Sequence, residues 1–282
     1  MLCAVGDLVE DVVVWLSAPP RRATDTPVRI FHRRGGSAAN VAAFAAGLAG
    51  AARFIGRVGD DAAGDRLVAE LTAAGVDVRV QQAGRSGTIV VLVDPAGERT
   101  MLPDRGAATE LSAVPVSWLD GVTVLHLPAY SLTVEPIASA CIGLAAAARA
   151  RNIPLSLDAS SVAVLEAFGV DRFRALAAEL APAVMLANAT EARLLGLAVQ
   201  PLAPVTVVKD GARPVVIVTG DDVPCQPVPV PPVALVADTT GAGDAFAAGF
   251  LATWSAGAPV AGAVRAGSTL AASILARPGA AS

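Results

Sequence analysis

The 282-residue chain has a formal net charge of −4, with 54% hydrophobic and 16% charged residues. This composition excludes an intrinsically disordered protein and offers no basic patch for nucleic acid. The cysteines Cys3, Cys141 and Cys225 are odd in number and far apart, which argues against a disulfide framework or a zinc site. Free thiols suit a reducing compartment, so we expect a cytoplasmic globular protein.

The first hundred residues alternate between strand-like and helical segments. Strands are predicted within about 11–16, 27–33, 76–82 and 88–102, where "DPAGE" is typical of a hairpin turn. Helices are predicted at 38–49 and 62–74, each followed by a glycine that can end it, Gly50 or Gly75. We expect the four strand segments to form a small β-lid.

From residue 120 onward, apolar runs alternate with alanine-rich helical stretches. The predicted buried strands are 123–127, 153–158, 183–188, 205–209 and 215–219, and the predicted helices are 136–150, 171–180 and 191–195. This alternation predicts an α/β fold whose mostly parallel central sheet is covered by helices on both faces. Ligands of such sheets gather at the carboxyl ends of the strands.

Two later stretches need separate interpretation. The charge-free run 245–264 is interrupted by Gly257 and Pro259, so we expect two packed helices and no membrane span. The proline-rich run 223–232 is expected to be an extended connector.

The stretch "GGSAANVAAF", residues 35–44, places two glycines before a helical pattern. Taken alone it indicates a helix start, with Ser37 or Asn40 as the cap. The amide of Asn40 could also bind a hydroxylated ligand, because it both donates and accepts hydrogen bonds.

The stretch "DTTGAGDAF", residues 238–246, is more informative. Gly241 and Gly243 expose backbone N–H groups at the start of a helix, which together make an anion site. Asp244 is either a helix cap or a base that faces a phosphoryl group held by those amides.

These two stretches, near opposite ends of the chain, resemble the two signatures of the ribokinase family, also called the PfkB carbohydrate kinases. "GRVGDDAAGDRLVAELTAAGV", "GERTMLPDRGA" and "NATEARLL" resemble other family segments in the same order. The resemblance covers essentially the whole chain. It implies one domain, 1–282, with a three-layer ribokinase-like fold and a β-lid. It also implies ATP-dependent phosphorylation of a hydroxyl, expected to be a primary one, on a small carbohydrate or sugar acid.

The resemblance assigns roles to individual residues. Asp244 would be the catalytic base beside an anion hole of Gly241, Ala242 and Gly243. The sugar contacts would be Asp11, Gly35, Gly36 and Asn40. The residues near ATP would be Asn188, Glu191, Lys209, Gly211 and Ser268, with Glu191 organising Mg²⁺ through water. A monovalent cation such as K⁺ would lie near Asp238 and Thr240, and we expect K⁺ to activate only partially.

Four positions depart from the family pattern. Ser37 stands where ribokinases usually have lysine, and Pro128 where they place a carboxylate near the sugar, so ribose is not singled out. Pro214 replaces a glycine of the nucleotide loop, and Ser268 an asparagine near the adenine.

Three expectations concern the ligands and partners. Arg105, in "LPDRGA", is expected to reach an anionic substrate group, because arginine binds carboxylates through two parallel hydrogen bonds. A homodimer through the lid is expected, because a sheet of few strands needs cover on one face. The alternatives to a sugar kinase are a nucleoside kinase of the same family and a catalytically silent sugar-binding relative.

Overall fold

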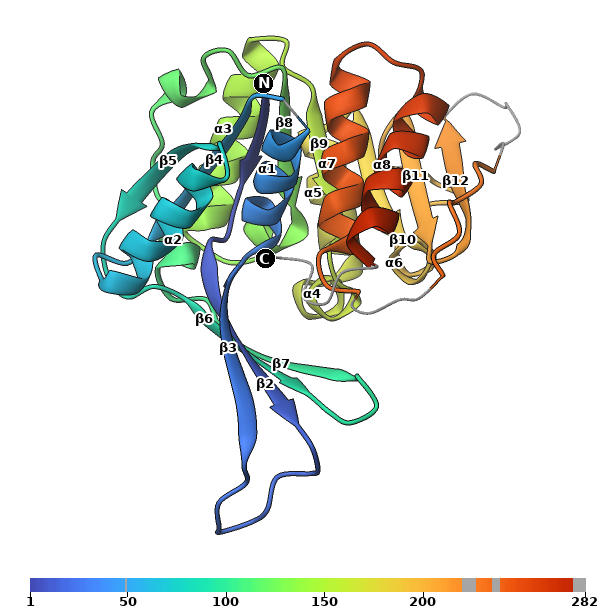
Figure 1. Cartoon of the computed structure of the whole chain (residues 1–282). Coiled ribbons are helices and arrows are strands. Elements are labelled where there is room, and N and C mark those ends of the chain that lie inside the picture. Colours follow the sequence, from blue (N-terminus) through green and yellow to red (C-terminus); the bar gives the residue numbers. More distant parts are fainter. Residues whose placement is uncertain (49, 220–226, 235–238, 276–282) are drawn as a thin grey trace.

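The computed structural model of the chain describes residues 1–48, 50–219, 227–234 and 239–275. These residues form an eight-stranded sheet with helices on both faces and a four-stranded sheet that projects from it (Figure 1). The large sheet has the order β12-β11-β10-β9-β8-β1-β4-β5. Its strands are β1 (Leu2–Val5), β4 (Ala52–Val58), β5 (Asp77–Gln82), β8 (Val124–Pro128), β9 (Leu155–Asp158), β10 (Val184–Asn188), β11 (Val205–Asp210) and β12 (Arg213–Thr219).

The large sheet is parallel except at one edge, where β12 runs antiparallel to β11. Both faces of the sheet are buried, and for this reason its strands are nearly continuous apolar runs. The fold is therefore the ribokinase-like α/β arrangement that the sequence predicts.

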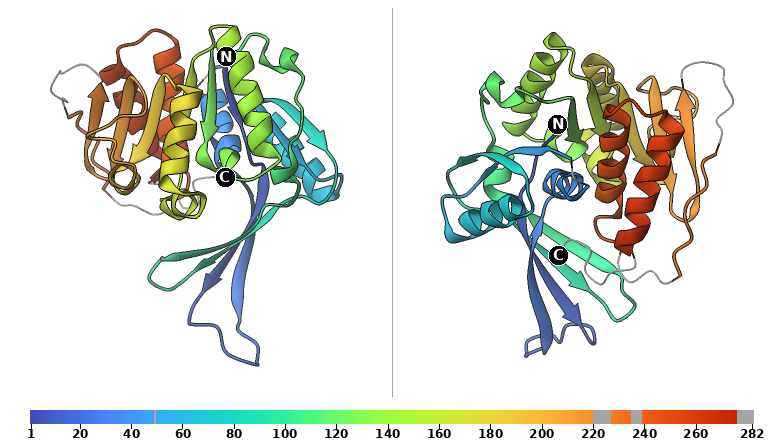
Figure 2. Two further views of the ribbon diagram at one scale, coloured as in Figure 1. Left: turned by 180° about the vertical axis from the view of Figure 1, so that it is seen from behind. Right: turned by 45° about the horizontal axis from the view of Figure 1, so that its top comes forward.

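Helices divide between the two faces of the large sheet, as the views of Figure 2 show. One face carries α1 (Ser37–Gly47), α2 (Ala62–Ala73), α7 (Ala242–Ser255) and α8 (Val260–Leu275). The other face carries α3 (Ile137–Ala150), α4 (Val162–Phe168), α5 (Val170–Leu180) and α6 (Ala189–Leu194). No helix among the described residues is long and apolar enough to cross a membrane.

Helices α7 and α8 lie close together because two glycines remove side chains from their interface. A Cβ atom on Gly267 would lie 2.7 Å from the carbonyl oxygen of Phe246, and one on Gly249 would lie 2.9 Å from that of Ala266. This packing fixes α7, whose first turn contains Asp244.

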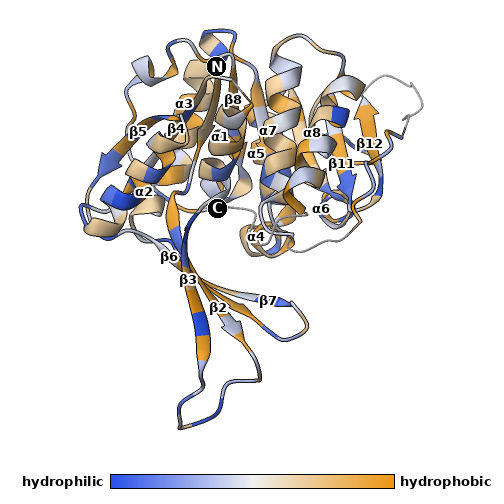
Figure 3. Ribbon diagram, viewed as in Figure 1, coloured by the Kyte–Doolittle hydropathy of each residue, from blue (hydrophilic) through white to orange (hydrophobic). Residues whose placement is uncertain are grey.

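The projecting sheet contains β2 (Val9–Leu16), β3 (Val28–Gly35), β6 (Thr88–Val93) and β7 (Arg99–Asp104), in the order β3-β2-β6-β7. We call this sheet the lid. Figure 3 shows hydrophobic residues along its strands, outside the helical layers. Exposed large side chains of the lid include Trp15, Ile30, Phe31, Met101 and Leu102.

One predicted lid segment was placed wrongly. Residues 76–82 contain β5, which pairs in parallel with β4 at the edge of the large sheet. Helix α2 connects β4 to β5, and a strand reached through a crossover helix returns parallel to the strand before it. An ion pair links β4 and β5, with Arg53 Nη2 2.6 Å from Asp77 Oδ2.

Candidate active site

The polar groups of the candidate site gather where strands of the large sheet end. Asp158 is the last residue of β9 and Asn188 the last of β10, and Asn188 is paired with Lys209 of β11. The first turn of α7 meets them, because Lys209 Nζ would lie 3.8 Å from a Cβ atom on Gly243. These are the carboxyl ends of the parallel strands, where the sequence predicts that ligands bind.

Asp244 does not cap its own helix. The N-cap of α7 is Gly241, in the left-handed conformation with φ 73°, and Asp244 is the third residue of the helix. Its carboxylate is held by α1, because Ser37 Oγ donates to Oδ1 at 2.7 Å and Asn40 Nδ2 donates to Oδ2 at 3.0 Å. The two glycine-containing sequence stretches therefore meet at this carboxylate.

The capping role expected for Ser37 or Asn40 is not observed. Helix α1 has Gly36 at its N-cap with φ 101° and no side-chain hydrogen bond at the cap. Gly36 is required because a Cβ atom would overlap the Asp7 carbonyl. Both polar side chains are thus directed to Asp244 and not to their own helix.

Arg34, which sequence reasoning missed, fixes the orientation of the Asn40 amide. Its Nη1 donates to Asn40 Oδ1 at 3.0 Å, and both residues are buried. A guanidinium only donates hydrogen bonds, so the amide must present its oxygen to Arg34 and its NH₂ to Asp244. The only available signal was its position directly before the glycine pair.

Burial raises the pKa of Asp244 to about 6, although the hydrogen bonds from Ser37 and Asn40 act in the opposite direction. Nearby Asp158 also raises this pKa, and Lys209 lowers it. The carboxylate is consequently ionised above pH 6 but remains a stronger base than an exposed aspartate.

Asp11 lies on the lid beside the same site. Its carboxylate rests against Gly35, where a Cβ atom would overlap it, so only glycine admits Asp11 here. Burial raises the pKa of Asp11 to about 6, with Arg34 lowering it and Asp244 raising it. The charges of Asp11 and Asp244 therefore influence each other across the site.

Lys209 and Asp158 form a partly buried ion pair beneath the first turn of α7. Lys209 Nζ is 3.0 Å from Asp158 Oδ2 and lies 5.6 Å from the centroid of the Phe246 ring. Burial lowers the pKa of Lys209, but Asp158, Glu191 and Asp244 outweigh burial and raise it. Asp158 was missed from the sequence, although it ends a predicted buried strand.

Asn188 and Glu191 form a capping box at the start of α6. The Asn188 side chain accepts from the amides of Thr190 and Glu191, and Asn188 N and Nδ2 donate to the two Glu191 oxygens at 2.8 and 2.7 Å. Burial raises the pKa of Glu191, and Asp158 raises it further. With both oxygens engaged, Glu191 suits contact with an ion through water better than direct ligation.

The other predicted residues have different surroundings. Gly211 sits at the β11–β12 turn with φ 60° and open space around it, and Thr240 directly precedes the N-cap of α7. Ser268 is buried in α8, and its hydroxyl has no hydrogen-bond partner among the described residues. Asp238 lies outside the described residues.

Arg105 is not free to bind a substrate anion. Its Nε and Nη2 donate to the two carboxylate oxygens of Asp7, each at 2.7 Å, and Nη2 also donates to the Tyr130 carbonyl at 3.0 Å. This bidentate pair uses the donors that were expected to face the substrate. Arg105 instead ties the base of the lid to the large sheet.

His126 is a buried neutral residue and not a candidate acid or base. Its Nδ1 lies 3.2 Å from Ser156 Oγ, and burial lowers its pKa to about 4. Its Nε2 has no partner among the described residues.

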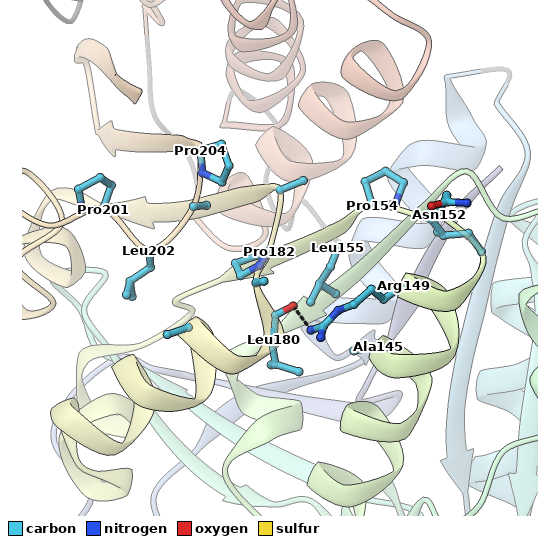
Figure 4. A pocket seen from close by; sticks show the side chains of 15 residues that line it. Ala145, Arg149, Asn152, Pro154, Leu155, Leu180, Pro182, Pro201, Leu202 and Pro204 are labelled. Atoms are coloured by element: carbon cyan, nitrogen blue, oxygen red, sulfur yellow. Dashed lines mark hydrogen bonds between the residues drawn. The ribbon is translucent and has the colours of Figure 1, made fainter. Parts of the chain in front are cut away.

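An open pocket of about 710 Å³ lies at the amino ends of the strands, on the side of the sheet opposite the candidate site. Pro154, Pro182 and Pro204, which precede strands β9, β10 and β11, line it together with Arg149 (Figure 4). Arg149 is occupied there, donating to the carbonyls of Glu179 and Leu180 at 2.8 Å. The pocket is remote from Asp244, and the guanidinium of Arg149 is already hydrogen-bonded there.

Metal ligands are sparse around the site. The described ranges contain no group of three or more His, Cys, Asp or Glu side chains that could hold a metal ion. Mg²⁺ commonly takes only one or two protein carboxylates, with water and phosphate completing its shell. Asp158 and Glu191 fit that limited role.

Removing the Ser37 hydroxyl should raise the pKa of Asp244. A hydrogen bond to an ionised carboxylate stabilises that form, so Ser37→Ala is expected to move the pKa above about 6. An NMR titration of the Asp244 carboxyl carbon measures it. Ser255→Ala, at the far end of α7, is the control and should leave this pKa unchanged. An equal or lower pKa in Ser37→Ala would contradict the prediction.

The sequence is similar to those of several known proteins. The chain is 33% identical over 263 residues to an ATP-dependent ribose-1-phosphate kinase of Halopiger xanaduensis, covering 89% of this chain and 83% of that protein. It is 36% identical over 165 residues to the bifunctional protein HldE of Pseudomonas paraeruginosa. That match covers 55% of this chain but only 34% of HldE, so the similarity spans about a third of that protein.

Solved structures share the fold at lower identity. Adenosine kinase from Sinorhizobium meliloti superposes with a TM-score of 0.86 at 21% identity, covering 98% of this chain and 94% of that one. Ribokinase from Arabidopsis thaliana, in complex with ribose and ATP, gives 0.81 at 22% identity, covering 99% and 93%. The model of the pfkB family carbohydrate kinases matches residues 1–282. With that match over its whole length and the identity to the Halopiger enzyme, the chain belongs to the pfkB family of carbohydrate kinases.

Proposed function

We propose that the chain, acting as a single domain, transfers the γ-phosphoryl group of ATP to a hydroxyl, a primary one, on a small carbohydrate or sugar acid. The observation that carries this proposal is the placement of Asp244. Its carboxylate is oriented by Ser37 and Asn40 and lies in the first turn of α7, beside the helix N-terminus. A base and an anion site are thus adjacent.

Asp244 would accept the proton of the attacking hydroxyl. With a pKa of about 6 it is ionised at neutral pH yet more basic than an exposed aspartate. Phosphoryl transfer through a loose transition state depends mainly on positioning and electrostatics, so a modest base suffices. Ser37 and Asn40 would supply the positioning.

The first turn of α7 would bind the transferring phosphoryl group. The first N–H groups of a helix have no intrahelical acceptor, and the helix dipole places partial positive charge there. Gly241 and Ala242 are half-buried, Gly243 is exposed and Ala245 is buried, so the turn is accessible at its first residues. Lys209 adds a positive charge below this turn.

The two ligands would approach from opposite sides of Asp244. Sugar hydroxyls would meet Asp11 and Asn40 above Gly35 and Gly36, on the lid side. ATP would lie along the carboxyl ends of β10 and β11, near Asn188, Glu191, Lys209 and Gly211, with Ser268 at its adenine end. Mg²⁺ would neutralise phosphate charge, with Glu191 and Asp158 holding its water shell.

A nucleoside kinase is the second candidate. The observation in its favour is the lid face that includes Asp11, because Trp15 and Phe31 fall on it by strand alternation and could stack on a base. A panel of sugars, sugar acids, sugar phosphates and nucleosides, assayed for ADP release, separates the two candidates. ADP release with nucleosides alone would replace the first proposal by the second.

Asp244→Asn should abolish most activity without unfolding the protein. Asparagine keeps the shape but accepts no proton, so kcat is expected to fall by roughly 10²–10⁴, the usual contribution of a positioned general base. Steady-state kinetics on the acceptor found by the panel measures it. Asp171→Asn, in the first turn of α5, is the matched control and should retain full kcat. Full activity in a folded Asp244→Asn protein would exclude this mechanism.

The same variant has a predictable effect on stability. Because the folded-state pKa of Asp244 is raised to about 6, the stabilisation it gives is present below its unfolded pKa and lost as pH rises through 6. The asparagine of the Asp244→Asn variant does not titrate. Thermal unfolding should therefore show the variant gaining stability relative to the wild type between pH 4 and pH 8.

We also propose weak activation by K⁺. Thr240 stands directly before the N-cap of α7, so an ion beside it would act by fixing the anion-hole loop. Replacing K⁺ by tetramethylammonium should lower kcat without abolishing it. A rate that is the same in both salts would remove the cation from the mechanism.

Dimerisation through the lid is a further part of the proposal. Ile30 and Leu102 are each 53% exposed, and strand alternation puts both on the lid face opposite Asp11. A second copy would bury this apolar face. Light scattering at micromolar concentration should give twice the chain mass, and Ile30→Asp should give the monomer mass. A monomeric wild type would refute this.

A further inference from the structure

The lid places an arginine beside the substrate aspartate. Strands β2 and β3 are antiparallel, and Asp11 is directly paired with Arg33. Side chains of directly opposite residues project from the same face of a sheet, with Cβ atoms about 5 Å apart. Arg33 therefore shares the face on which Asp11 turns toward Gly35 and the site.

Arg33 makes no hydrogen bond or ion pair among the residues that the structure describes, unlike the other arginines near the site. Arg34 donates to Asn40, Arg66 to Glu10, and Arg105 to Asp7. Within the described ranges, the Arg33 side chain makes no hydrogen bond or ion pair, and it is half-buried. The charge of Arg33 lowers the pKa of the neighbouring Asp11, but its guanidinium donors make no hydrogen bond among the described residues and can bind an anion.

A negatively charged acceptor would need a positive charge to offset the nearby carboxylates. Asp11 and Asp244 are both carboxylates, and a negatively charged acceptor placed between them would be repelled. Arg34 offsets part of that charge, but it is buried and bonded to Asn40. Arg33 has donors free to bind the anion itself.

We infer that Arg33 binds a phosphate or carboxylate group on the acceptor, at the end remote from the hydroxyl that is phosphorylated. The Asp11 carboxylate lies against Gly35, and Arg33 is two residues further out on β3, so Arg33 would face the end of the acceptor that is remote from Asp244. The chain is then a kinase for sugar phosphates or sugar acids in preference to neutral sugars. This inference rests on the proposed kinase function and replaces Arg105, the anion contact expected from the sequence.

Kinetics with three acceptors test the inference. The acceptors are ribose 1-phosphate, gluconate and ribose, assayed with the wild type, Arg33→Gln, Arg33→Lys and Arg29→Gln. Arg29 lies on the same strand and face, roughly 13 Å further from Asp11, and it too has no partner among the described residues. It is the matched control for loss of a lid charge.

The wild type should use at least one anionic acceptor better than ribose. Arg33→Gln should lower kcat/KM for that acceptor by about 30-fold or more, mainly by raising KM. A 30-fold loss is at the low end of what removing one partner of a buried charge pair costs. The variant's kcat/KM for ribose should fall by much less, because ribose carries no anionic group and only the effect of Arg33 on the charge of Asp11 is lost. Arg33→Lys should be intermediate, and Arg29→Gln should match the wild type.

Each outcome has a distinct meaning. Preference for ribose 1-phosphate identifies a phosphate, and preference for gluconate a carboxylate. A wild type that prefers ribose, or an Arg33→Gln effect equal for all three acceptors, overturns the inference and leaves the kinase proposal intact. If no acceptor releases ADP, the kinase proposal fails for this panel, and calorimetric binding of ribose 1-phosphate still decides on Arg33. Equal affinity, or no binding, in wild type and Arg33→Gln then overturns the inference.

Discussion

The arrangement of the site depends on one partly buried contact between two helices distant in sequence. Ser37 and Asn40 of α1 donate to the two oxygens of Asp244 in α7, and Arg34 fixes the amide that makes one of these bonds. A buried carboxylate is costly unless its oxygens are satisfied. The contact therefore sets where α7 begins relative to α1, and with it the position of the exposed first turn.

Much of this could be predicted from the sequence, because the signals were local. Apolar runs between alanine-rich stretches give a parallel sheet, and the glycines before two helical patterns mark the turns at Gly36 and Gly241. Segment 76–82 was misplaced because a strand's propensity does not say which sheet it joins. Its pairing with β4 follows from the crossover through α2, which is a property of the chain path.

The contacts between side chains were harder to predict than the path of the backbone. Arg105 and Arg33 look alike in sequence, yet Arg105 is bonded to Asp7, whereas Arg33 makes no hydrogen bond or ion pair among the described residues. Ser37 looked like a helix cap because capping is the common use of serine before a helix, but here the N-cap is Gly36. Such pairings join residues far apart in the chain, and nothing in the local pattern specifies them.

The path of the chain from β3 into α1 has a mechanical consequence. Lid strand β3 ends at Gly35, and α1 begins at Ser37, so only Gly36 separates the lid from the helix whose side chains hold Asp244. Gly36 has little conformational freedom, because its φ is positive and the Asp7 carbonyl lies against it. A tilt of the lid would therefore rotate the first turn of α1. In the proposed mechanism, binding of the acceptor against the lid and alignment of Asp244 would then occur in one movement.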